Sequence, residues 1–173
     1  MPGNSSSPDA ARRAQPNPDD AVGLLRAERL ALALLFAEFK RTRSASNKQA
    51  LVAEICDLLE VHLQVQEELF YPAVLPLLRD AALIAQASVD HAGIKDLVWQ
   101  LRDLTPAAER YDARVGTLAG QVEQHGAEEE RTMFPQVRAG TLDLGALGAR
   151  MKLRRAVITA AVLRAPAVHP PLA

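Results

Sequence analysis

Apolar residues recur every three or four positions through four long stretches of the chain, and this spacing constrains the fold more than any other feature. The stretches cover about residues 19–43, 47–70, 80–104 and 107–134. Residues three and four apart share one face of an α-helix, so each stretch has a face suited to burial. Helices joined by short connections typically pack side by side in opposite directions. The sequence therefore predicts an all-α fold, an antiparallel up-down-up-down four-helix bundle.

Polar and proline-containing segments indicate where these helices begin and end. Asp19 or Asp20 is expected to cap the first helix, and Ser46 or Asn47 the second. The second and fourth stretches close with the sequences FYP and FP. Proline has no N–H to donate within a helix, so both helices are expected to end there.

The remainder of the chain flanks this bundle. Residues 1–18 are rich in Pro, Ser and Asn and are expected to form a disordered N-terminal tail. Residues 19–138 make up the predicted bundle domain. Residues 139–173 are expected to contain an additional C-terminal helix, over about 142–163, and then a Pro-rich tail. Hydrophobic residues are 49% of the 173, enough to fill one core of this size.

Composition narrows the classes of function. The formal net charge of -1 argues against non-specific nucleic-acid binding, which needs a basic surface. No apolar stretch approaches the ~20 residues that cross a bilayer, and the N-terminus lacks the apolar core of a secretory signal. The single cysteine, Cys56, excludes an intramolecular disulfide and a Cys-based metal site, and is expected to be a small buried hydrophobe. We therefore expect a cytoplasmic protein without a nucleic-acid or membrane partner.

Each apolar stripe contains polar residues at positions that should be buried. Continuing the spacing gives Arg29, His62, Gln66, His91, His125 and Glu129. At ~1.5 Å rise per residue, their helices should bring them to within about one turn of one level. A lone core histidine is usually explained by hydrogen bonding within the core. Three histidines and a glutamate at one level favour a metal ion, because burying them without a partner costs several kcal/mol.

A repeated local pattern supports this interpretation. The sequences HLQVQEELFYP and HGAEEERTMFP each place a histidine ten positions before a proline, with acidic residues between. His125 and Glu129, four residues apart, share a helix face and can hold one ion. Glu67 and Glu130 lie five residues after a histidine, where they can supply another ligand or hydrogen-bond the ligands from outside. The predicted metal-binding residues are His62, His91, His125, Glu129, Glu67 and Glu130.

These motifs resemble those of the hemerythrin/HHE cation-binding family. The matching segments are DAVGLLRAERLALALLFAEF, EICDLLEVHLQVQEELFYPAV, and the region from DHAGIKDL to VEQHGAEEERTMFPQVR. Together they span about residues 19–138. The resemblance implies a four-helix bundle that binds iron, often as a pair, with roles in oxygen or nitric oxide binding, redox sensing, iron handling or stress response.

The sequence departs from the family pattern at three positions. The family has a histidine where this chain has Arg29, and usually a glutamate where it has Gln66. Members that carry oxygen have a second histidine where this chain has Lys95. A di-iron centre with five histidine ligands therefore cannot be assembled within one subunit.

Arg29 is the sharpest of these departures. A buried guanidinium stays charged and needs a carboxylate. We expect Arg29 to pair with an acidic residue, take the place of one cation and repel a second metal ion. The candidates are Glu67, Glu129 and Glu130. The alternative is that Arg29 extends between helices to water.

Three functional interpretations remain open at this point. The first is an iron-binding protein, mononuclear or with a partial di-iron pair, in which zinc or manganese could replace iron; its ligand would be O2 or NO. The second is a degenerate, metal-free bundle that acts as an interaction or structural protein, for instance as a homodimer. The third, a ferritin-like oxidase, needs Glu-x-x-His motifs, but Leu59 and Val122 stand three residues before His62 and His125. We assign no catalytic residues and expect binding rather than catalysis.

Overall fold

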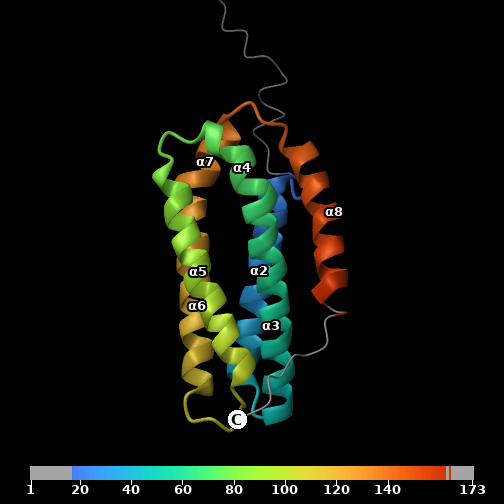
Figure 1. Ribbon diagram of the computed structural model, residues 1–173, viewed down its shortest axis with the longest axis vertical. Coiled ribbons are helices and arrows are strands. Elements are labelled where there is room, and N and C mark those ends of the chain that lie inside the picture. Colours follow the sequence, from blue (N-terminus) through green and yellow to red (C-terminus); the bar gives the residue numbers. More distant parts are fainter. Residues whose placement is uncertain (1–16, 163, 165–173) are drawn as a thin grey trace, which may run out of the picture.

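Four long helices run alternately up and down and form a bundle in the computed structural model, which describes residues 17–162 and 164 (Figure 1). The four are α2 (Ala21–Arg41), α3 (Ala45–Val65), α5 (Ala82–Asp103) and α6 (Tyr111–Glu128). The described part of the chain contains no strand. The predicted fold class is confirmed. The expected N-terminal tail up to residue 16 and the expected Pro-rich C-terminal tail lie outside the described residues.

A further helix, α8 (Leu144–Val162), lies outside the four and packs against α2 and α3 (Figure 1). Gly148 allows this close approach. A Cβ atom at that position would lie 2.8 Å from the carbonyl oxygen of Asp19 and 2.9 Å from the backbone nitrogen of Ala21. A larger residue would therefore push α8 away from the start of α2.

The observed helix caps agree only in part with those predicted from the sequence. Asp20 caps α2, where its carboxylate accepts a hydrogen bond from the backbone N–H of Gly23 at 2.8 Å. The expectation of Ser46 or Asn47 as the second cap is wrong, because α3 begins earlier. Its cap is Ser44, whose hydroxyl accepts from the Asn47 backbone N–H.

The expectation that the two Phe-rich proline motifs end their helices is also wrong. At each motif the chain passes through a short π-helix and continues as a helix. After α3, η1 (Gln66–Phe70) leads into α4 (Tyr71–Val74) and a 3₁₀ turn, η2 (Leu75–Leu77). After α6, η3 (Glu129–Met133) leads into α7 (Phe134–Ala139).

The physical reason is the missing proline N–H. Pro72 and Pro135 each stand at the start of the following helix, where that N–H is not needed. The turn before each proline widens instead, so that the backbone N–H of Tyr71 bonds the carbonyl of Gln66, five residues earlier. Single π turns of this kind often occur at functional sites.

The core consists of two apolar clusters separated by a polar layer. The upper cluster in Figure 1 joins the tops of the bundle helices to α4, α7 and α8, and includes Leu25, Phe70 and Met151. The lower cluster includes Leu32 and Ile94. The polar stripe residues follow Leu25 and precede Leu32 on α2, and lie between corresponding apolar residues on the other helices. Between the clusters, contacts join His91 to His125, and Glu129 to Gln66 and His125, while the His62 ring contacts Glu28.

Cys56 lies in the lower cluster, buried and unpaired with sulfur. Burial raises the pKa of its thiol to about 12. A thiol that stays protonated is a weak nucleophile and a weak metal ligand. Cys56 therefore packs as a small apolar residue, as expected.

Across residues 17–162, we find no helix with the length and hydropathy needed to cross a membrane.

Candidate metal centre

The polar layer contains seven buried side chains, each of which hydrogen-bonds at least one other member of the layer. They are Glu28, His62, Gln66, Tyr71, His91, His125 and Glu129. Sequence periodicity identified five of them. Glu28 and Tyr71 are additions from the structure.

His91 and His125 meet at the centre of this layer, with Nε2 atoms 3.2 Å apart. The Tyr71 hydroxyl lies 2.9 Å from Nε2 of His91 and donates a hydrogen bond to Glu129 Oε1 at 2.9 Å. The other oxygen, Glu129 Oε2, lies 3.7 Å from Nε2 of His125. Two ligands bound to one ion at ~2.1 Å lie roughly 3.0–3.4 Å apart. The four groups are therefore spaced much like neighbouring ligands of a single cation.

The two π segments supply part of this geometry. η1 directly precedes Tyr71, and η3 begins with Glu129. Tyr71 is 3% exposed, so the wider turn directs its ring into the bundle rather than to the surface. The proline that follows Tyr71 is the sequence signal that identifies such a turn, because a helix that continues past proline must rearrange its hydrogen bonds.

The Nδ1 atom of each of the three histidines in the layer faces a carboxylate oxygen from a neighbouring helix. The pairs are His62 with Glu28 at 2.6 Å, His91 with Glu67 at 2.9 Å, and His125 with Asp90 at 3.4 Å. A carboxylate at Nδ1 keeps a proton there and leaves Nε2 with its lone pair, the form that binds metals. The helical spacing did not predict Glu28 and Asp90, because each stands one residue before a stripe position.

Burial and the neighbouring His125 lower the pKa of His91 to about 4. The His91 ring is therefore neutral at pH 7, and Nε2 is free to bind a cation. Burial and the charge of Glu129 raise the pKa of Tyr71. Its phenol keeps its proton and serves as a hydrogen-bond donor.

Arg29 closes one side of the layer. Its Nη1 donates a hydrogen bond to the carbonyl of Gly126 and lies 3.9 Å from Glu129 Oε2, and its Nη2 lies 3.6 Å from Glu130 Oε2. The expected pairing with an acidic residue is thus confirmed for Glu129 and Glu130. Gly126 makes room for the arginine, since a Cβ there would lie 2.7 Å from Arg29 Cδ.

The other two predicted acidic residues lie farther out. Glu130 is 45% exposed and binds Arg26, from which its Oε2 accepts a hydrogen bond at 3.0 Å. Glu67 accepts from Lys95 at 2.7 Å in addition to its contact with His91. Glu67 therefore supports a histidine from outside, and Glu130 lies beside the arginines at the surface.

The chemistry of the buried donors is compatible with a cation. Glu129 Oε2 and Gln66 Oε1 are buried and accept no hydrogen bond from any residue in the described range, whereas a cation would satisfy both. Imidazole nitrogens with carboxylate oxygens suit iron, zinc or manganese. Within residues 17–162 and 164, no three His, Cys, Asp or Glu side chains are grouped as a metal site. The Tyr71 hydroxyl, between His91 and Glu129, would have to join the ligands or turn aside.

Comparisons with known proteins identify the family and the fold. The sequence profile of the family described as Hemerythrin HHE cation binding domain matches residues 20–137. The crystal structure of an HHE cation binding domain-containing protein from Mycobacterium kansasii superposes with a TM-score of 0.73, covering 83% of this chain and 90% of that one, at 24% identity. A DNA nickase from Nostoc sp. (strain PCC 7120) is 27% identical over 105 residues, or 61% of this chain. The chain spans 30% of that relative's length.

Proposed function

Because the chain belongs to the hemerythrin HHE cation-binding family, we propose that it binds one transition-metal ion, iron, in the polar layer of its bundle. The proposed ligands are His62, His91, His125 and Glu129. The observation that carries the proposal is that Nε2 of His125 lies 3.2 Å from Nε2 of His91 and 3.7 Å from Glu129 Oε2. Zinc and manganese are the alternatives that the same donors accept.

The charge of Arg29 favours a site with one bound ion over a site with two. Its guanidinium lies beside Glu129 and supplies a fixed positive charge where a second cation would need a carboxylate. Gln66 also favours one ion, because it supplies a neutral amide where the family usually has a carboxylate. Its Nε2 donates a hydrogen bond to Glu129 Oε1 at 2.8 Å.

Bound iron would supply open coordination positions for O2 or NO, or a change of oxidation state for redox sensing or iron handling. The chain's own groups would prepare that site. Glu28, Glu67 and Asp90 orient the three imidazoles, and Tyr71 holds a proton beside them. The apolar clusters above and below the polar layer limit the access of water.

Anaerobic titration of chelator-treated protein with Fe(II), followed by metal analysis, tests this proposal. We expect one equivalent per chain, and a loss of binding in His91→Gln. Cys56→Ala, a buried change outside the layer, serves as the control and should bind as the wild type does. Uptake well below one equivalent contradicts cation binding. Two equivalents, with the absorption bands of oxo-bridged di-iron after the loaded protein is exposed to O2, contradict a single ion.

A second candidate function is favoured by the hydrogen bonds already made within the layer. Tyr71, Gln66 and Arg29 together surround Glu129 without any ion. In that case the bundle would act as a metal-free interaction or structural protein. Identical thermal unfolding of chelated and Fe(II)-treated protein would support it, because a ligand that binds only the folded state must raise its stability.

A further inference from the structure

Two adjacent arginines of α8 pair with acidic residues of neighbouring elements, and one of these acids, Glu28, belongs to the polar layer. Nη1 of Arg155 lies 3.0 Å from Glu28 Oε1. Nε and Nη2 of Arg154 lie 2.5 Å and 2.9 Å from the two oxygens of Glu68. This helix follows the residues that match the family profile, which end at 137. A part of the chain outside the family domain therefore contacts the candidate site.

Glu28 connects α8 to a histidine. Its side chain is 8% exposed, and while Oε1 faces Arg155, Oε2 lies 2.6 Å from Nδ1 of His62. One buried carboxylate thus bridges an arginine on α8 and an imidazole on α3. A carboxylate held at both oxygens has one orientation, and so does the ring that it contacts.

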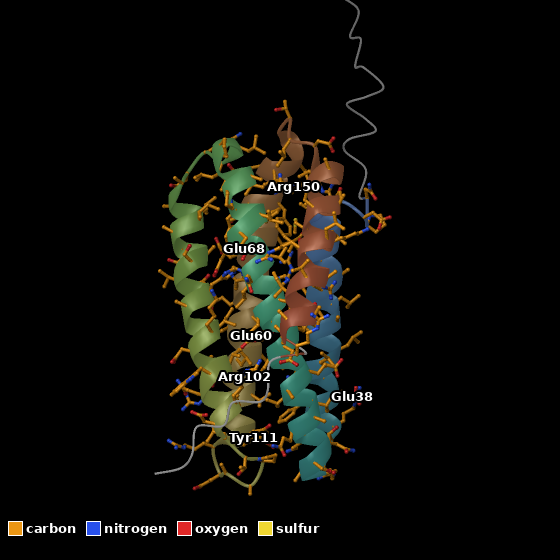
Figure 2. The ribbon with its side chains drawn as sticks, turned by 45° about the vertical axis from the view of Figure 1, so that its right-hand side comes forward. Glu38, Glu60, Glu68, Arg102, Tyr111 and Arg150 are labelled. Atoms are coloured by element: carbon orange, nitrogen blue, oxygen red, sulfur yellow. The ribbon has the colours of Figure 1, made fainter. Side chains whose placement is uncertain are left out.

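α8 is fixed firmly enough to hold Arg155 in place. Met151 and Ile158 lie in the upper cluster, and Gly148 sits against the backbone at the start of α2. Lys152 binds Asp19 at 2.7 Å. Figure 2 shows α8 lying along α2 and α3, with Glu68 labelled on the α3 side.

We propose that α8 is a positioning element for the metal site, in which Arg155 holds the Glu28 carboxylate and Glu28 holds the ring of His62. Arg155 touches neither metal nor ligand atoms, so it is a positioning residue and not a ligand. The proposal rests on the proposed function only in that the positioned imidazole serves to bind a cation. Outer partners of this kind typically change metal affinity by ~10–100-fold.

Titration with Co(II) measures the effect on affinity. Arg155→Gln is expected to weaken Co(II) binding by about tenfold without changing the stoichiometry, and Arg155→Lys to recover part of the loss. Arg154→Gln is the matched control, because it breaks an ion pair of the same helix without touching Glu28. Arg150→Gln, an exposed change on α8, is a second control. Both controls should bind Co(II) as the wild type does.

A double-mutant cycle separates positioning from general stabilisation. Glu28→Gln should also weaken binding, and adding Arg155→Gln to it should have little further effect if the two act in sequence. The metal-free proteins provide an independent measurement, the imidazole ¹⁵N NMR signals of His62. We expect these signals to move or broaden in Arg155→Gln and to stay unchanged in Arg154→Gln.

Two outcomes overturn the proposal. One is an Arg155→Gln protein with wild-type affinity and unchanged His62 signals. The other is an equal loss of affinity in Arg154→Gln, which would mean that α8 acts only by stabilising the bundle. If the wild type takes up no Co(II) or Fe(II), the proposed function fails, while the NMR comparison still decides whether Arg155 positions His62.

Discussion

Replacement of Arg29 by glutamine should affect stability and metal affinity in opposite directions. Glu129 is 2% exposed, and the Arg29 guanidinium lies 3.9 Å from its Oε2. At an effective dielectric constant of ~20, that attraction is about 4 kcal/mol before desolvation is subtracted. Arg29→Gln removes the desolvation cost of burying the guanidinium. It also loses one hydrogen bond to the Gly126 carbonyl, worth ~1 kcal/mol. We therefore expect the metal-free variant to lose about 2 kcal/mol of unfolding free energy.

The same substitution should strengthen metal binding. It removes a fixed positive charge beside the carboxylate that would bind the cation, so the dissociation constant should fall by about tenfold or more, or ~1.4 kcal/mol. Urea unfolding in the presence of a chelator measures the first effect, and Co(II) titration measures the second. Arg26→Gln is the control, because Arg26 forms an exposed ion pair with Glu130 that contributes at most ~1 kcal/mol.

The reasoning is refuted if Arg29→Gln weakens metal binding in parallel with its loss of stability. That result would mean that the arginine supports the site instead of taking the place of a cation. It is also refuted if the variant is as stable as Arg26→Gln, because the buried carboxylate would then not depend on the guanidinium.

Three further predictions follow from the same residues. The metal-free protein should lose stability as the pH falls from ~6.5 to about 4, because the pKa of His91 is lowered to about 4 and the unfolded chain takes up its proton first; urea midpoints over that range measure the loss, at most ~3 kcal/mol. Tyr71→Phe removes a donor to Glu129 and should destabilise the metal-free protein by ~1–2 kcal/mol in thermal unfolding, an effect that saturating metal should reduce. Gly126→Ala should cost ~1–3 kcal/mol by forcing Arg29 to move, whereas Gly120→Ala, with open space around its Cβ, should stabilise α6 slightly.

The helical periodicity was sufficient to predict the bundle and the meeting of His91 with His125. It failed beyond the two proline motifs, because it assumes a constant ~3.6 residues per turn. Tyr71 stands nine residues after His62, which in an uninterrupted helix is about 180° away from it. The π turn at η1 adds one residue to the turn and rotates Tyr71 into the core. Local sequence alone does not show that rotation unless Pro72 is interpreted as a bulge instead of an end.

The role of Glu28 could not be predicted for a different reason. It lies beside the stripe rather than on it, at a position usually occupied by a solvated residue. Its burial depends on α8, which covers α2 and supplies Arg155. The packing of α8 is tertiary, and no spacing within residues 21–41 indicates which helix will cover that face.

The division of the core by a polar layer has a consequence for how the protein opens. Among the described residues, α8 contributes to the upper cluster, whereas the lower cluster consists of side chains from the four bundle helices and their connections. Amide protons around the lower cluster should therefore exchange with solvent through smaller, more frequent fluctuations than those near α4 and α7. A cation bound between the clusters would link them into one cooperative unit, and would slow exchange at the end of the bundle that it does not touch.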